Sequence, residues 1–397
     1  METVDSPLLL LLGCFLLAGY AAHAIGHQTH IPRVILLLLL GIGIGPFGLD
    51  LVPAYAQQWF PIATQAALSV VGFELGEKFL GATIRKVGKS LLIISLTKVL
   101  GTAAVVFLVL ILFQFPIELA LIFAGIAPAT APATTADVIN EIKAKGELTE
   151  TALRLVAIDD AWGVILFSLM LAAAAIISGD HSANGLIWDG TREIFGAIVL
   201  GAIIGLPMAW VTGRVSEGEL TLIEALGFVF LCGGLAAALD LSYILACMSM
   251  GCVVSNVAKH HARPFHAIEN VRQPFLIIFF VLAGFHTDIT GLLTLGLLSV
   301  VYILGRTLGI ISATYTGAYL AGSSTRIRNH IGWCMLPQAG VALGLALMAA
   351  DRFPELGGQV LSTIVGTCIF FEIAGPLSTR LTLRRAGEVP DLFSDSD

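Results

Sequence analysis

Residues 151–177, TALRLVAIDDAWGVILFSLMLAAAAII, form an apolar segment that is long enough to cross a bilayer and carries two adjacent carboxylates, Asp159 and Asp160. A carboxylate at bilayer depth costs several kcal/mol unless water, a counter-charge or a bound cation compensates it. A helix end at the membrane interface is the alternative, but both residues lie well inside the segment. The pair therefore predicts an ion or proton site within a membrane protein.

The composition of the whole chain indicates the same class of protein. Hydrophobic residues make up 57% of the 397 residues and charged residues only 12%, far outside the range of soluble domains. The formal net charge is -7 and no basic patch is present, so we expect no nucleic-acid partner. The six cysteines lie in apolar segments without the spacing of a metal site or a disulfide framework. We therefore expect a polytopic all-α protein without a cofactor.

Apolar runs of spanning length predict thirteen transmembrane helices joined by short loops. Their approximate bounds are 7–25, 33–51, 60–80, 87–113, 117–141, 149–177, 191–213, 220–238, 241–258, 266–288, 291–320, 328–350 and 356–381. Cytoplasmic loops hold most of the Lys and Arg residues of a membrane protein, and all but four of the 21 fall on one side of this topology. The exceptions are Arg192 and Arg352 on the other side and Lys98 and Arg306 within spans. We therefore predict a multi-pass protein of the plasma (inner) membrane, with its N-terminus outside and its C-terminus cytoplasmic.

Rare polar residues recur in the two halves of the chain. The matched positions are Glu74 and His286, Lys98 and Arg306, Pro132 and Pro337, and Asp160 and Glu372. The matched spans are an odd number of spans apart, so the two halves would cross the bilayer in opposite directions. This predicts two inverted six-helix repeats with a connecting helix at 191–213, an arrangement characteristic of secondary transporters. A chance alignment of selected polar residues is the alternative.

Two of the predicted spans carry interruptions at corresponding positions. In residues 125–137, GIAPATAPATTAD, Pro128 and Pro132 each remove a backbone donor and break the helix at mid-membrane. Thr134 and Asp137 have the spacing of a helix N-cap and an acid at N3, which predicts that a half-helix starts there. The second interruption is predicted at Pro337, Gln338 and Gly340. A pair of discontinuous helices indicates an ion site, because helix ends and free carbonyls meet there.

In these motifs the chain resembles the monovalent cation/proton antiporters, a family that includes the bacterial sodium/proton exchangers. The most specific string is AIDDAWG at 157–163, which is similar to the Asp-Asp motif of the family's sixth span. The supporting strings are the Pro/Thr-rich break around Pro132, GRTLG at 305–309, LPQAGVA at 336–342 and FEIAGP at 371–376. The resemblance covers nearly the whole chain. It implies a secondary active transporter rather than an enzyme, working as a homodimer in lipid.

The resemblance also implies how the spans divide into domains. The divisions are 1–86 and 220–288 for a dimerisation domain, 87–177 and 291–381 for the two repeats of a core transport domain, 191–213 for a linker helix and 386–397 for a short acidic tail. The discontinuous helices of the core would cross each other. Transport would proceed by an elevator-like movement of one domain against the other.

By the same resemblance, Asp160 binds either the cation or a proton, and Asp159 is its neighbour in a Na+ site. Burial favours the protonated form of a carboxyl group, and a hard cation with oxygen ligands displaces that proton. Competition for one acid therefore gives exchange. Movement of the unloaded anion through hydrocarbon is costly, which couples the two fluxes. The expected ligands at the crossovers are Thr130, Pro132, Thr134, Thr135, Pro337 and Gln338.

Arg306 and Glu372 are expected to supply the counter-charges of the site. Arg306 would pair with Glu372 or Asp159 and offset the negative charge of the half-helix ends, or it would take part directly in ion exchange. Family members with an Asp-Asp pair tend to carry Lys at this position, whereas Arg tends to accompany an Asn-Asp pair. Because Arg does not release its proton, a second proton would have to be carried by Asp159 or by no residue at all. The number of protons exchanged stays open.

The sequence leaves two possibilities open for each of two further charged residues. Glu74 either guides cations at the entrance of the cavity or is a glutamate at a helix end. Lys98, inside a core span, is expected to pair with Asp137 or Glu118.

The sequence thus favours exchange of Na+ or Li+ for H+, with a role in pH homeostasis. A K+/H+ antiporter of the same fold is the nearest alternative. Na+-coupled uptake of an organic anion would need more hydroxyls and positive charge around the crossovers. An intramembrane aspartyl protease would need its two acids on separate helices, and a channel would need no pair of broken helices.

Overall fold

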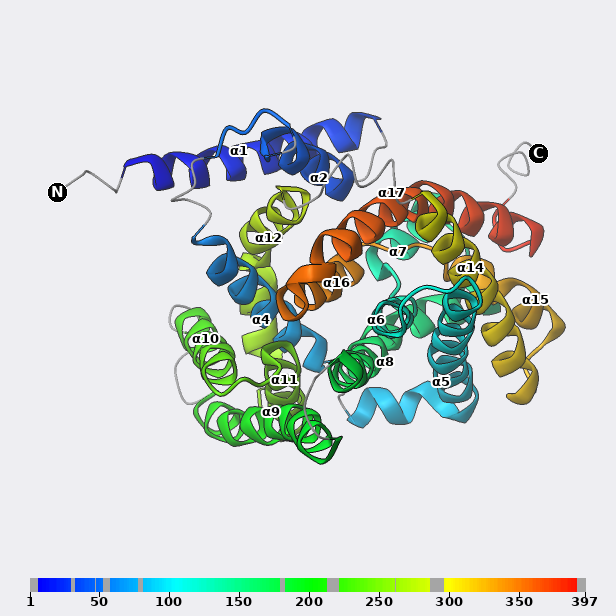
Figure 1. Ribbon diagram of the computed structural model, residues 1–397. Coiled ribbons are helices and arrows are strands. Elements are labelled where there is room, and N and C mark those ends of the chain that lie inside the picture. Colours follow the sequence, from blue (N-terminus) through cyan, green and yellow to red (C-terminus); the bar gives the residue numbers. More distant parts are fainter. Residues whose placement is uncertain are drawn as a thin grey trace, which may run out of the picture. The chain divides into compact units, whose positions relative to one another are not determined.

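The computed structural model describes residues 6–29, 33–46, 48–52, 58–77, 81–178, 183–212, 221–260, 262–285 and 296–390. Within these ranges all regular structure is helical, which confirms the predicted class. The helices (Figure 1) are α1 (Ser6–Thr29), α2 (Arg33–Ile44), α4 (Phe60–Glu77), α5 (Gly81–Leu112), α6 (Ile117–Ile126), α7 (Pro132–Glu141), α8 (Glu147–Ser178), α9 (Ala183–Val211), α10 (Thr221–Ala238), α11 (Tyr243–Val257), α12 (Ala262–Phe285), α14 (Gly296–Leu320), α15 (Thr325–Cys334), α16 (Gly340–Arg352) and α17 (Pro354–Arg385).

The chain divides into two compact units. Unit 1 consists of Met1–Gly81 and Asp180–Leu293, and unit 2 consists of Ala82–Gly179 and Thr294–Asp397. Within unit 1, α11 packs against α4 and α9, and α12 packs against α2 and α4. A Cβ atom on Gly251 of α11 would lie 3.1 Å from the Cα atom of Gly76 in α4, so small residues permit this close helix contact.

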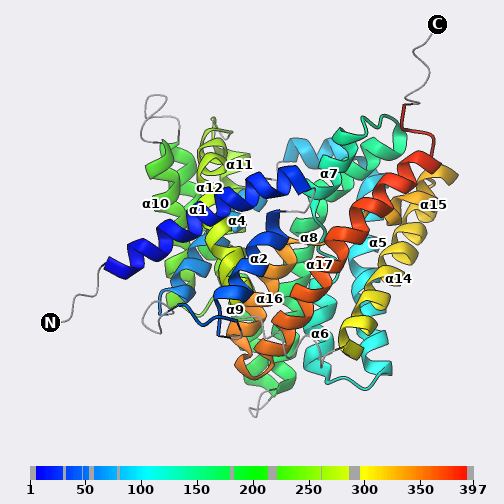
Figure 2. The same cartoon turned by 90° about the horizontal axis from the view of Figure 1, so that it is seen from above.

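Unit 2 contains the residues of the predicted ion site. Its helices α5 and α14 lie side by side (Figure 2), and a Cβ atom on Gly309 of α14 would lie 3.1 Å from the Cα atom of Thr102 in α5. Helix α6 packs against α8, and α16 packs against α17. The close approach of α5 and α14 brings together the two spans that carry Lys98 and Arg306.

Both interruptions predicted from the prolines are present in unit 2. Helix α6 ends at Ile126 and α7 begins at Pro132, whereas α15 ends at Cys334 and α16 begins at Gly340. The two breaks are in contact, because the backbone N–H of Ala131 donates to the carbonyl of Pro337 at 3.0 Å. Proline explains the first break, since its ring removes a donor and starts the following helix at its first position.

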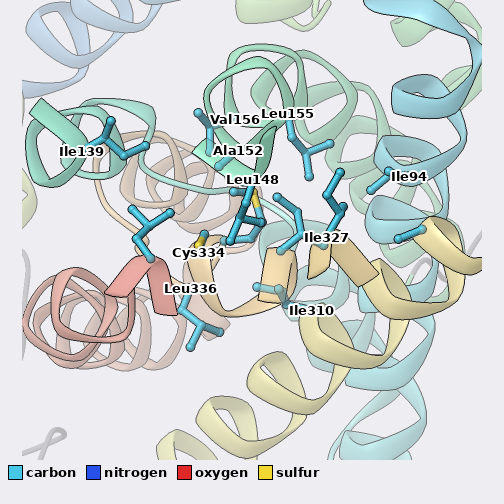
Figure 3. Packing of buried hydrophobic residues seen from close by; sticks show 14 of the residues in the cluster. Ile94, Ile139, Leu148, Ala152, Leu155, Val156, Ile310, Ile327, Cys334 and Leu336 are labelled. Carbon is cyan, nitrogen blue, oxygen red and sulfur yellow. The ribbon is translucent and has the colours of Figure 1, made fainter. Parts of the chain in front are cut away.

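A hydrophobic cluster fixes one end of unit 2 (Figure 3). It combines side chains from α5, α7, α8, α14, α15 and α17 and from one interruption, among them Ile94 of α5, Ile139 of α7, Leu148, Ala152, Leu155 and Val156 of α8, Ile310 of α14, Ile327 and Cys334 of α15, Leu383 of α17, and Leu336. All of these side chains are buried. Their burial holds the first half of α8, and with it the position of Asp159, against the neighbouring helices.

Five helices of the described residues are long and apolar enough to cross a membrane: Gly88–Leu112, Glu147–Ser178, Thr221–Ala238, Gly296–Leu320 and Glu355–Arg385. A sixth span is added if the bent pair Ala262–Glu269 and Val271–Phe285 counts as one. The predicted spans 117–141 and 328–350 do not qualify as single helices, because each is divided by its interruption. The structure therefore supports a multi-pass membrane protein.

Candidate ion-binding site

Asp159 lies on α8 with no exposed surface, and α5 provides its bonding partners. The Lys98 ammonium is 2.6 Å from Oδ2 of Asp159 and forms a salt bridge with it. The Ser95 hydroxyl donates to Oδ1 at 3.1 Å. Ser95 and Lys98 are three residues apart and so lie on one face of α5. The buried carboxylate is thus compensated by a full positive charge and a hydroxyl.

Lys98 also connects the acid to the first interruption, since its ammonium donates to the carbonyl of Pro128 at 2.9 Å. The sequence-based partners of Lys98, Asp137 and Glu118, were therefore wrong: the salt bridge is with Asp159. A sequence signal existed, because Ser95 and Lys98 are polar residues on one face of an apolar span. What the sequence lacked was the register of α5 against α8.

Arg306 of α14 is fully buried and donates to three backbone carbonyls. Its Nε bonds the carbonyl of Ala127 at 3.0 Å, its Nη2 that of Ala129 at 2.9 Å and its Nη1 that of Leu336 at 2.7 Å. The guanidinium also lies 4.2 Å from the ring centre of Phe371. Arg306 therefore stabilises carbonyls in both interruptions, where the helix ends leave negative partial charge. Its described contacts include neither acid proposed as its partner.

Glu372 of α17, which is 3% exposed, binds the hydroxyl of Thr134 instead. The Thr134 Oγ1 donates to the two carboxylate oxygens of Glu372 at 3.1 and 3.4 Å. Thr134 was expected to be an N-cap, which is wrong: α7 begins at Pro132, and its N-cap residue Ala131 makes no side-chain bond. Because Pro132 already starts the helix, the Thr134 side chain lies within the first turn and is available to α17.

The remaining predicted crossover residues surround the two breaks. The amide of Gln338 donates to the Tyr302 hydroxyl at 3.1 Å and lies 3.5 Å from the carbonyl of Ile126. The Thr135 hydroxyl is 3.5 Å from the carbonyl of Cys334. The Thr130 hydroxyl is buried and has no hydrogen-bond partner among the described residues. The breaks thus combine carbonyl, hydroxyl and amide oxygens, the ligand types that alkali cations use.

Asp160 and Glu74 are the remaining predicted residues. Asp160 follows Asp159 in α8, but its side chain lies outside the part of the structure that is described. Glu74 belongs to α4 of unit 1 and forms a salt bridge with Arg272 of α12. The repeat partner assigned to Glu74, His286, also lies outside the described residues.

Two interrupted helices in contact, a buried acid paired with a lysine and a set of long apolar helices define a membrane transporter fold. Comparison with protein families agrees: residues 11–385 match the transmembrane sodium/hydrogen exchanger family. The chain therefore belongs to the sodium/hydrogen exchanger family and is a cation/proton antiporter by class.

Individual relatives support this assignment. The chain is 22% identical over 371 residues to the ammonium/H(+) antiporter subunit AmhT of Alkalihalophilus pseudofirmus, covering 92% of this chain and 93% of that protein. It is 28% identical over 198 residues to Na(+)/H(+) antiporter 1 of Methanocaldococcus jannaschii, covering 49% and 45% of the two chains. The solved structure of the sodium proton antiporter MjNhaP1 from Methanocaldococcus jannaschii at pH 8 has the same fold, with a TM-score of 0.73, 18% identity and coverage of 96% and 98%.

Proposed function

We propose that the protein exchanges Na+ or Li+ for H+, with Asp160 and Asp159 as the residues that bind the cation or the proton. The observation that carries this proposal is the fully buried Asp159 carboxylate, whose partner at 2.6 Å is the Lys98 ammonium. An entering cation can take the place of the ammonium on the carboxylate. The carbonyl of Pro128 in the first interruption would be one further ligand, since the same ammonium bonds it.

The exchange follows from competition for these acids. When Na+ binds, Asp160 loses its proton and Asp159 exchanges the Lys98 ammonium for the metal ion. An ammonium without a paired carboxylate can release a proton, and we propose that Lys98 does so when the metal ion takes its place on Asp159. Lys98 therefore supplies the second proton carrier that Arg306 cannot provide. On this scheme two protons leave for each Na+ that binds, and the exchange moves net charge.

The organisation of the molecule follows the same proposal. The core transport domain, 87–177 and 291–381, would move as an elevator against a dimerisation domain formed by 1–86 and 220–288. The full chain would have thirteen spans in two inverted repeats, with the N-terminus outside, the C-terminus cytoplasmic and a homodimer in the plasma membrane. Glu74, with Arg272 as its partner, would lie at the cavity entrance. Support comes from the MjNhaP1-like fold and from the two compact units.

The test is exchange in proteoliposomes with an imposed pH gradient, adding Na+, Li+ and K+ in turn. Wild type should exchange Na+ and Li+, Asp160→Asn should lower exchange at least 100-fold, and Asp159→Asn should raise the apparent KM for the cation about tenfold, as expected for one lost charged ligand. Glu355→Gln, an exposed acid in the first turn of α17, is the matched control. Normal turnover of Asp160→Asn would count decisively against the assignment.

Exchange of a different monovalent cation is the second candidate. The similarity to proteins named as an ammonium/H(+) antiporter subunit and as cation/H(+) antiporter 19 of Arabidopsis thaliana, the latter at 26% identity over 377 residues, supports it. The same oxygen ligands suit K+, and the ammonium ion can donate hydrogen bonds to them. The K+ arm of the assay, with an added NH4+ arm, decides between these substrates.

A further inference from the structure

One buried acid connects the segment after α17 to the helix that carries Asp159. Glu388 is 5% exposed. Its carboxylate accepts hydrogen bonds from the backbone N–H groups of Leu148 at 2.8 Å and Thr149 at 2.7 Å, and from the Thr149 hydroxyl at 2.7 Å. Leu148 and Thr149 lie in the first turn of α8, where backbone N–H groups have no partner within the helix. Glu388 therefore caps α8 from a distant part of the chain.

The backbone of Glu388 holds this side chain in place. Its N–H donates to the carbonyl of Leu383 in α17 at 3.1 Å, and its own carbonyl accepts from the N–H of Lys145 at 2.8 Å. Lys145 lies in the connection between α7 and α8. Gly146 leaves room for the carboxylate, because a Cβ atom at that position would overlap the carboxyl carbon of Glu388. One residue thus joins the end of α17, the α7–α8 connection and the start of α8.

The helices that meet at Glu388 carry the acids and the hydroxyl of the candidate site. Asp159 lies on α8, Glu372 on α17 and Thr134 on α7. Helix α7 packs against both α8 and α17, and Figure 2 shows the end of α17 beside α7. Asp159 is eleven residues from Leu148, which is about 16 Å along the helix axis. A change in the position of the capped end is transmitted over this distance, because a packed helix moves as a rigid rod.

We propose that Glu388 is a positioning residue of the antiporter. By fixing the start of α8 to the end of α17, it keeps Asp159 and Glu372 at one spacing while a cation is bound. A negative charge at this place is favoured twice, since it accepts orphan N–H groups and complements the positive end of the helix dipole. The inference rests on the proposed exchange at Asp159 and Asp160.

The first experiment measures apparent KM and maximal rate of cation exchange in proteoliposomes containing equal amounts of folded transporter. Glu388→Ala should raise the apparent KM five- to tenfold, because ligand oxygens displaced by a fraction of an ångström bind the cation less well. Glu388→Gln, which keeps one acceptor oxygen, should raise it less, and Glu355→Gln should leave it unchanged. An unchanged KM in Glu388→Ala, whatever the maximal rate, would mean that Glu388 does not position the cation ligands, and would overturn the proposal.

A second variant disturbs the contact between Glu388 and α8 without changing Glu388 itself. Gly146→Ala should displace the carboxylate and raise KM as Glu388→Ala does. Hydrogen exchange of the Leu148 and Thr149 amides should be at least tenfold faster in both variants, a measurement that needs no transport. Fast amide exchange with a wild-type KM would overturn the positioning role alone. Absence of cation exchange in the wild type would instead overturn the proposed function.

Discussion

Lys98 and Arg306, the two buried basic residues in the part of unit 2 that the structure describes, lie on neighbouring helices and are compensated in different ways. Lys98 of α5 forms a salt bridge with a carboxylate, whereas Arg306 of α14 donates to carbonyls of both interruptions. An ammonium is a compact charge that can lose its proton when buried, and a guanidinium effectively cannot. On the proposed mechanism, the positive charge of Lys98 would be replaced by an incoming cation, whereas the positive charge of Arg306 would remain with the carbonyls that it bonds.

The difference follows from the geometry of the two donors. A planar guanidinium presents donors in several fixed directions, and that of Arg306 joins two carbonyls of the first interruption to one of the second. An ammonium is a compact charge on a flexible stem, and that of Lys98 bonds the Asp159 carboxylate and the Pro128 carbonyl. We therefore expect substitutions of Arg306 to affect stability first and substitutions of Lys98 to affect ion coupling as well.

The largest effect should come from Arg306→Met. It leaves the carbonyls of Ala127, Ala129 and Leu336 without their donor in a buried site, at about 1–3 kcal/mol for each group. We expect a loss of about 4 kcal/mol in unfolding free energy, because partial rearrangement will satisfy some carbonyls. Thermal unfolding of the variant and the wild type in detergent measures this loss of stability. Wild-type stability would mean that the three bonds do not hold the interruptions together.

Lys98→Met should cost about 3 kcal/mol, since it leaves a buried acid without its charged partner. The double variant Lys98→Met with Asp159→Asn should recover most of this loss, because no unpaired charge is then left. The same unfolding measurement on the three variants gives the coupling energy of the pair. If the double variant is as unstable as the sum of the two single variants, the salt bridge does not contribute to stability.

Features set by the local sequence could be predicted, whereas contacts between helices could not. The interruption at Pro132 followed from a local property, the missing backbone donor of proline, and the structure places α7 accordingly. The partner of Lys98 depended on how α5 faces α8, and no local pattern encodes that register. For the same reason the pairing of Thr134 with Glu372 was missed, although both residues had been singled out separately.

Arg306 illustrates a second limit of sequence analysis. A buried arginine suggests an acidic partner, and Glu372 and Asp159 were the acids predicted from the sequence. Its observed partners are carbonyls, which every residue possesses and which become acceptors only where a helix is interrupted. The family and the all-helical membrane class could thus be predicted from motifs and composition, whereas the distribution of charges within the site required the tertiary structure.

The substitutions Lys98→Arg and Arg306→Lys should distinguish the roles of the two residues in the coupling of cation and proton transport. Lys98→Arg keeps a positive charge beside Asp159 but cannot release a proton. We expect exchange about tenfold slower and no longer dependent on the membrane potential, whereas Arg306→Lys should remain potential-dependent. Transport with and without valinomycin, at fixed K+ concentrations, measures this dependence. If Lys98→Arg still moves net charge, Lys98 is not the carrier of the second proton, and the distinction between the two cations concerns stability alone.

The smallest effect should come from Thr134→Val, which removes the hydroxyl that binds Glu372 while keeping nearly the same volume. One such hydrogen bond contributes about 1 kcal/mol, which corresponds to roughly a fivefold rise in the apparent KM for the cation if Glu372 helps to hold the second interruption near Asp159. The matched control is Thr379→Val on α17, whose hydroxyl donates only to the carbonyl of Gly375 in its own helix. Equal KM values for the two variants would show that Glu372, like Arg306, stabilises the framework without affecting how tightly the cation is bound.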